Sequence, residues 1–157
     1  MKKFIQNKLK EQKGLTLIEL LAVIVILAII AAIAIPAIGN VIENSRYGAI
    51  KSDAVNILAA ADVYYADGNV GAVATEVTVA ELKSGGYLDN AGSFEADAAN
   101  TKVTKAVAGT TPVPAKLTGK AVVGSVKLTL TGATRNDINK ISKANIPVGT
   151  AVTVTTP

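Results

Sequence analysis

The 157-residue sequence contains no cysteine and no histidine. These absences exclude disulfides, thiolate chemistry, zinc sites built from Cys and His, and acid–base catalysis by histidine. They do not exclude an oxidising compartment, because a protein can fold there without disulfides. No nucleophile–base pair and no phosphate-binding loop stands out either. We therefore expect a protein that is not an enzyme and that holds no cofactor and no metal.

The balance of charge changes along the chain. Residues 1–14 carry a net charge of +4, residues 41–99 a net charge of −6, and residues 100–157 a net charge of +7. Such an asymmetry affects association rather than fold. The sequence predicts that stacked copies pair unlike faces, so that their association weakens as salt concentration rises.

Charged residues are nearly absent between Leu15 and Gly39, where only Glu19 is ionisable. The stretch from Leu20 to Ile38 is apolar throughout, and a bilayer span needs about 20 such residues. Lysines precede it, so the positive-inside rule places the N-terminus in the cytoplasm and the C-terminal part outside.

Glu19 is costly in this setting, because a carboxylate in hydrocarbon costs about 2.5–3.5 kcal/mol on insertion scales. A buried charge persists where it has a partner. The next basic side chain along the helix is Arg46, roughly 40 Å away by helix rise. A cut after Gly14 would create an α-amine about one turn away. We predict that Glu19 pairs with such an amine, from its own chain or from a neighbouring copy.

Three interpretations of residues 1–40 compete. A secretory signal peptide would explain the basic start, the apolar run and the "AIA" pattern at Ala32–Ala34, but not Glu19 or the amphipathic helix that follows directly. A plain membrane anchor would explain the length of the run, but neither Glu19 nor Gly14. The third interpretation is the precursor of a type IV pilin, and it depends on a resemblance.

The segment "KGLTLIELLAVIVILAIIAAIAIP" resembles the N-terminus of type IV pilins and of the pseudopilins of type II secretion and competence systems. In that family a short basic leader ends in Gly, a Glu is the fifth residue after the cut, and a Pro is commonly the twenty-second. Gly14, Leu15, Glu19 and Pro36 fall in this register. Leu15 departs from the family, which usually has Phe at that position.

The resemblance implies that a prepilin peptidase cuts between Gly14 and Leu15 and methylates the new amine of Leu15. It implies that Glu19 pairs with the terminal amine of an adjacent subunit. An assembly ATPase and a platform protein would draw the helix from the membrane into a helical homo-oligomer. The chain would be a single-pass cytoplasmic-membrane protein first and an extracellular surface filament later.

The resemblance leaves the role of the filament open among adhesion, twitching motility and DNA uptake. The lack of cysteine departs from the disulfide loop common in Gram-negative pilins and favours a Gram-positive source. Two alternatives stay open: a major pseudopilin of a competence or type II secretion apparatus, and a monomeric membrane-anchored binding domain.

The predicted fold class is α+β. One helix from about Leu15 to about Asp67, kinked or loosened near Pro36 and Gly39, should pack its C-terminal half on a small antiparallel sheet domain. The predicted organisation is a cleaved leader (1–14), a transmembrane and assembly helix (15–40) and an extracytoplasmic domain (41–157), with the helix continuing over 41–67. Apolar residues at helical spacing define the packing stripe: Val41, Tyr47, Ile50, Ala54, Ile57, Leu58, Ala61, Tyr64 and Tyr65.

Residues 68–157 are predicted to form loops, a short helix and a sheet of about three or four strands. Thr78 and Glu81 form a capping box for the short helix, which Gly85 should end. Strands are expected over 125–132 and 151–157, with weaker ones over 102–108 and over 116–124, the last broken at Gly119 into a hairpin. Residues 134–145 favour one or two helical turns, and residues 90–114 should be long loops.

The basic half could contact phosphates. Its lysines would then hold DNA or an anionic cell-surface polymer without reading sequence. The alternative is that they are solvated residues at strand edges, where charge prevents aggregation. The candidate residues are Lys102, Lys105, Lys116, Lys120 and Lys127.

Overall fold

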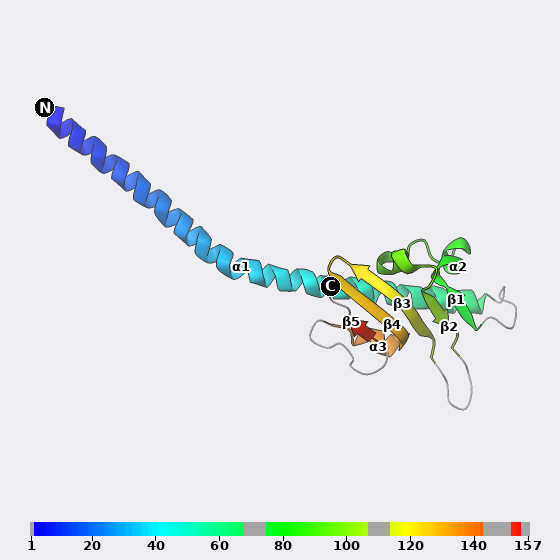
Figure 1. Ribbon diagram of the computed structural model, residues 1–157. Coiled ribbons are helices and arrows are strands. Elements are labelled where there is room, and N and C mark those ends of the chain that lie inside the picture. Colours follow the sequence, from blue (N-terminus) through cyan, green and yellow to red (C-terminus); the bar gives the residue numbers. More distant parts are fainter. Residues whose placement is uncertain (1, 68–74, 107–113, 143–151, 155–157) are drawn as a thin grey trace. The chain divides into compact units, whose positions relative to one another are not determined.

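The computed structural model describes residues 2–67, 75–106, 114–142 and 152–154, with side chains described from residue 17 to residue 142 within these ranges (Figure 1). The chain divides into two compact units, Met1–Val41 and Ile42–Pro157. We describe each unit by itself.

The first unit is helical. Helix α1 spans Lys2–Ala66, so it begins well before the predicted start at Leu15. The physical reason lies in the composition of residues 2–14, where Lys, Gln, Leu and Glu are all good helix formers. The predicted end near Asp67 is confirmed within one residue.

Helix α1 continues without a break across Pro36 and Gly39. Pro36 has no N–H to donate to the Ala32 carbonyl, which weakens the helix at this turn. The predicted kink or local loosening near Pro36 stays a prediction.

The second unit joins the C-terminal part of α1 to a five-stranded antiparallel sheet, which confirms the α+β class. The strands follow chain order across the sheet, from β1 to β5. Figure 1 shows α1 running along one face of this sheet. The strands are β1 (Glu76–Thr78), β2 (Lys102–Thr104), β3 (Lys116–Val123), β4 (Val126–Thr134) and β5 (Val152–Val154).

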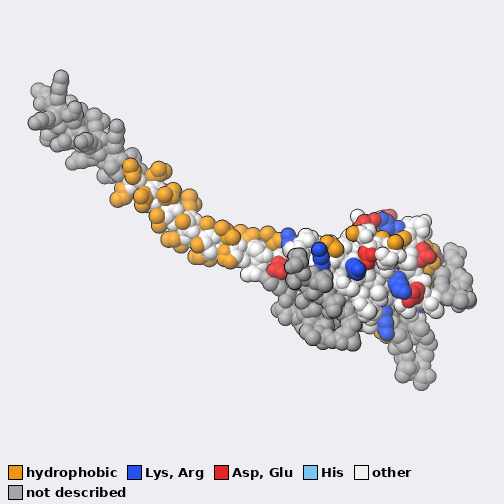
Figure 2. All heavy atoms as spheres, viewed as in Figure 1, with side chains coloured by type: hydrophobic (Ala, Val, Ile, Leu, Met, Phe, Trp, Pro, Cys, Tyr) orange, Lys and Arg blue, Asp and Glu red, His pale blue; other side chains and the backbone are white. Residues whose placement is uncertain are grey.

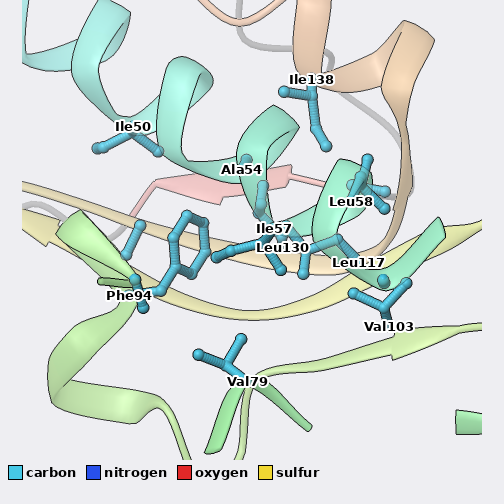
Figure 3. Close-up of a cluster of buried hydrophobic side chains, with 14 of the residues drawn as sticks. Ile50, Ala54, Ile57, Leu58, Val79, Phe94, Val103, Leu117, Leu130 and Ile138 are labelled. Carbon is cyan, nitrogen blue, oxygen red and sulfur yellow. The ribbon is translucent and has the colours of Figure 1, made fainter. Parts of the chain in front are cut away.

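The core lies between α1 and the sheet. In Figure 3, Ile57 and Leu58 of α1 point towards Leu117 and Leu130 of the central strands, with Phe94 closing one end. The predicted stripe is confirmed from Tyr47 onward, although Tyr64 and Tyr65 are only half-buried and Val41 is exposed. The fully buried positions on α1 follow steps of three and four residues: Ile50, Ala54, Ile57, Leu58 and Ala61.

The central hairpin joins β3 to β4 at Gly124, which has a positive φ of 59°. The prediction of a break at Gly119 is wrong, because β3 continues through it. Gly119 is present because a Cβ there would lie 2.4 Å from Thr101 Oγ1. A second glycine, Gly132, has a φ of 64° where the β3–β4 register shifts between Leu117 and Gly119.

The prediction of long loops over 90–114 is wrong in part, because these residues contain the 3-10 helix η1 (Gly92–Asp97). The predicted strand over 102–108 is confirmed as β2, although it is shorter. Residues 107–113 lie outside the described residues. Strand β1 was not predicted at all, because three residues are too short for alternation to be visible. Strands β2 and β1 exist through pairing with β3 and with each other.

Two short helices complete the unit. The predicted capping box starts α2 (Val79–Ser84), where Thr78 Oγ1 accepts the Glu81 N–H at 3.2 Å. The predicted turn after β4 is α3 (Arg135–Asn139), which begins with a second capping box between Thr134 and Asp137.

Candidate functional site

The exposed apolar part of α1, Leu17–Val41, is the first candidate site. Its large hydrophobic side chains are between 48 and 69 % exposed, and none is buried. Figure 2 shows hydrophobic side chains (orange) covering this stretch on the visible face. Exposed apolar surface of this extent marks a surface that binds a membrane or other protein.

Glu19 is the only ionisable residue in this stretch, and it is exposed. Among the residues whose side chains the structure describes, none forms a hydrogen bond or ion pair with Glu19. Gly14 and Leu15 lie within the helical backbone of α1, and their surroundings are outside the described side chains. The predicted pairing of Glu19 with an amine at Leu15 therefore stays a prediction.

In the described part of the chain, α1 is a helix long and apolar enough to cross a membrane. No residue in its most apolar window is buried within the protein. Length, composition and exposure agree with a segment that is covered by something outside its own chain.

Comparison with known families identifies a motif in this segment. Residues 9–35 match the family model described as the prokaryotic N-terminal methylation motif. The chain carries the class III signal motif of type IV pilins. The match includes Gly14, Leu15 and Glu19 and ends one residue before Pro36.

The motif supports a place in the type IV pilin and pseudopilin family, whose members are structural subunits. A long N-terminal helix packed on an antiparallel sheet is consistent with the type IV pilin fold. The motif implies processing by prepilin peptidase and assembly as a filament subunit. The comparisons with curated proteins and with solved structures found no match.

The five candidate lysines do not form one group. Lys102, Lys116, Lys120 and Lys127 lie on the sheet face opposite α1. Lys105 does not share this face of the sheet. Its Nζ lies 5.4 Å from the centre of the Tyr65 ring on α1. The structure thus brings four of the five onto one face.

The acidic residues of the second unit are largely used inside it. Asp53, for example, accepts the Ser93 N–H at 2.7 Å and so holds η1 against α1. Lys102 and Arg135 pair with acidic partners at 2.7 Å and 2.9 Å, and Lys83 pairs with Glu95. At least seven of the nine acidic residues between 41 and 99 have a partner of this kind: Asp53, Asp62, Asp67, Glu76, Glu81, Glu95 and Asp97.

The expectation that unlike faces of stacked copies pair stays a prediction. Two carboxylates of the acidic segment, Glu76 and Asp62, pair with Lys102 and Arg135 of the basic segment, so the acidic segment offers less free charge than its net −6 suggests. Lysines are different, because Lys116, Lys120 and Lys127 have no ion pair with any described residue.

Several structural roles could not be seen in the sequence. Arg46 of α1 donates to Ser125 at the tip of the β3–β4 hairpin, 79 residues further along the chain. Tyr64 contacts Tyr65 and Tyr87 edge to face, and burial is the main cause that raises the pKa of Tyr65 to about 12. No local spacing signals the contacts of Arg46 with Ser125 and of Tyr64 with Tyr87, because these residues are distant in the sequence.

Proposed function

We propose that the chain is the precursor of a type IV pilin that polymerises into a surface filament. The leader 1–14 would be removed, residues 15–40 would span the membrane and later line the filament core, and residues 41–157 would face outward. The observation that carries the proposal is the exposed apolar helix with one carboxylate, Glu19, set in the register of the methylation motif.

Two environments can cover Leu17–Val41. A bilayer covers apolar side chains all round the helix, but it disfavours the Glu19 carboxylate by about 2.5–3.5 kcal/mol. A bundle of like helices covers the same side chains and can also bring the free amine of Leu15 from a neighbouring copy. Only the bundle gives Glu19 a partner, so the carboxylate favours transfer from lipid to filament.

Processing at Gly14 supports the same sequence of events. The leader contains five lysines, which favour a cytoplasmic position for this end of the helix. Its removal deletes this positive charge and creates the amine at Leu15. An assembly ATPase and a platform protein would then extract the helix from the membrane.

The proposal is tested by replacing Glu19 with its uncharged isostere. Wild-type chain, Glu19→Gln and the control Asp89→Asn are expressed with a pilus assembly system, and sheared filaments are weighed. Asp89 is exposed and has no described partner, so its replacement removes one negative charge without breaking a contact. We expect filaments from wild type and control, and loss of nearly all filaments from Glu19→Gln.

Mass spectrometry of the chain purified from the cells of each culture identifies the N-terminus. All three chains should begin at N-methylated Leu15, because the cut precedes assembly. An uncut chain that stays in the membrane, or equal filament yield from Glu19→Gln, would contradict the proposal and favour a simple anchor.

Pro36 and Gly39 would act after assembly. The missing N–H of Pro36 and the low helix propensity of Gly39 make this the weakest part of the apolar helix. We expect it to unwind when filaments stretch. A cryo-electron microscopy map of the fibre with continuous α-helix through residues 30–40 would reject this expectation.

A further inference from the structure

The sheet of the second unit has two unlike faces. One face packs on α1 and is apolar. The other alternates lysine and threonine, with one exposed valine, Val122. On the three strands β2, β3 and β4 this face contains Lys102, Thr104, Lys116, Thr118, Lys120, Val122, Lys127, Thr129, Thr131 and Thr134.

The strand register arranges the lysines of this face in a bent line, with Lys102 at the corner. Thr118 lies opposite Lys102, so Lys102 is the diagonal neighbour of both Lys116 and Lys120. Thr129 lies opposite Lys120, so Lys127 is the next diagonal neighbour. Diagonal neighbours on a sheet are roughly 7–8 Å apart. We call Lys102, Lys116, Lys120 and Lys127 the lysine row.

Most of the lysine row is free of intramolecular partners. Lys102 pairs with Glu76 at 2.7 Å, whereas the side chains of the other three members have no polar partner among the described residues. Asp97 lies near the row, and its carboxylate accepts the Lys120 backbone N–H at 3.2 Å. Four lysines and two carboxylates leave a formal charge of +2, and Figure 2 shows basic side chains (blue) spread over the visible side of the domain.

Protection of strand edges explains only part of the position of these lysines, because charged residues that prevent edge-to-edge pairing belong on strand edges. In the described residues β2 pairs with β3 only over Lys116–Thr118, and β5 pairs with β4 only over Leu128–Leu130, so Lys120 and Lys127 have a strand partner on one side. Lys116 is paired on both sides, with Thr104 and Thr134, so edge protection does not explain its charge.

We propose that the lysine row binds a phosphodiester polymer through its backbone. Ammonium groups at regular spacing match a chain that carries one negative charge per repeat. Thr118 adds a hydroxyl, which accepts the Gly132 N–H at 2.9 Å and keeps its own O–H to donate outward. The described face has no aromatic side chain on which a base could stack, so the polymer is held without recognition of bases.

The binding test uses the full chain in neutral detergent, so it does not depend on filament assembly. Failure of the proposed pilin function and failure of this proposal are then distinguishable. Fluorescent poly(glycerol phosphate) and duplex DNA are titrated at several salt concentrations, with polyglutamate as a polyanion without phosphate. We expect both phosphodiester polymers to bind more tightly than polyglutamate, with affinity that falls as salt rises.

The decisive variant is K116Q/K120Q/K127Q. Its matched control is K51Q/K83Q/K140Q, which removes the same charge from other surfaces of the domain. We expect the row variant to lose roughly tenfold or more in affinity and to reduce the salt slope by about three, one for each lysine. The control should lose at most about threefold.

An added charge provides a second test. Val122→Lys places a cation opposite Lys127 and should tighten binding of both phosphodiester polymers. Urea unfolding checks that each variant is folded. Equal losses in the row variant and its control, equal binding of polyglutamate, or no effect of either substitution set would overturn the proposal. If only one phosphodiester polymer binds, that polymer is identified as the source of the phosphates.

Discussion

The two parts of helix α1 have the same secondary structure and opposite surroundings. From Leu17 to Val41 the large apolar side chains are exposed all round the helix, whereas from Ile42 to Ala66 one stripe is fully buried against the sheet. A helix that is apolar all round must be covered on every side, but an amphipathic helix needs one partner. The second part finds its partner within the chain, and the first must find it in lipid or in other copies.

The two parts of the helix also differ in whether their acidic side chains have partners within the chain. The first part contains Glu19 without a described partner, while Asp53 and Asp62 of the second part are bound to Ser93 and Arg135. Charge in the second part stabilises the fold of one chain. Charge in the first part is available for contact with another molecule.

Among the changes that test this difference between the two parts, removal of residues 1–41 should have the largest effect, which is on solubility and association. Among the residues whose side chains are described, the core begins at Tyr47, so the fragment 42–157 should fold without residues 1–41. We expect it to be soluble and monomeric without detergent in analytical ultracentrifugation, whereas the full chain should aggregate. A fragment that is unfolded by circular dichroism would show that the second unit depends on the first.

Single substitutions in the two parts should differ by several kcal/mol. Ile57 is fully buried and Ile30 is 56 % exposed. Ile57→Ala should lower the free energy of unfolding of the domain by about 2–5 kcal/mol, because it leaves a cavity. Ile30→Ala is the matched control and should leave that free energy unchanged.

The measurement is urea unfolding of both full-length variants in neutral detergent. A loss of more than about 1 kcal/mol in Ile30→Ala would mean that the first part contributes to the stability of the domain. That outcome would contradict the separation of the two parts.

The sequence predicts the features that depend on local pattern. The stripe from Tyr47 to Ala61 and the alternation around Leu128 are local, and both are confirmed. Strand β1 and helix η1 were missed because they depend on pairing and on Asp53, far away in the chain. Gly119 was read as a turn, although a distant side chain, Thr101, is what requires glycine there.

The candidate sites follow the same division. The methylation motif depends on the spacing of residues that are close together in the sequence. The family match to residues 9–35 confirms the motif. The lysines were visible as a basic region, but their faces were not. Strand register decides that Lys120 joins the row and that Lys105 contacts Tyr65 instead.

Two glycines test which close approaches the fold requires. Gly119→Ala would place a Cβ 2.4 Å from Thr101 Oγ1, so we expect a loss of about 1–3 kcal/mol from overpacking. Gly48→Ala is the control on α1, where no atom lies within 4 Å of the added Cβ. It should stabilise the domain by about 0.5–1 kcal/mol through helix propensity. Thermal unfolding measures both, and equal shifts would show that the Thr101 contact is unimportant.

Acid pH should produce the smallest effect, and it should act on the second unit through its capping boxes. Hydrogen bonds from the backbone and hydroxyl of Thr78 hold the pKa of Glu81 below its ordinary 4.5, and those from the hydroxyl and backbone of Thr134 hold the pKa of Asp137 below 3.8. Because the folded pKa lies below the unfolded one, this stabilisation is complete above about pH 4.5 and is lost as pH falls through the folded values.

Glu81→Gln and Asp137→Asn should therefore flatten the decline in unfolding free energy between pH 5 and pH 3, measured by urea unfolding of the fragment 42–157. Asp89→Asn, whose parent residue has no described partner, should leave that decline unchanged. Since Lys102 and Lys83 also lower the pKa of Glu76 and Glu95, part of the decline should persist in the double variant. A decline as steep in Glu81→Gln/Asp137→Asn as in the wild type would show that the capping boxes add little to the stability of the domain.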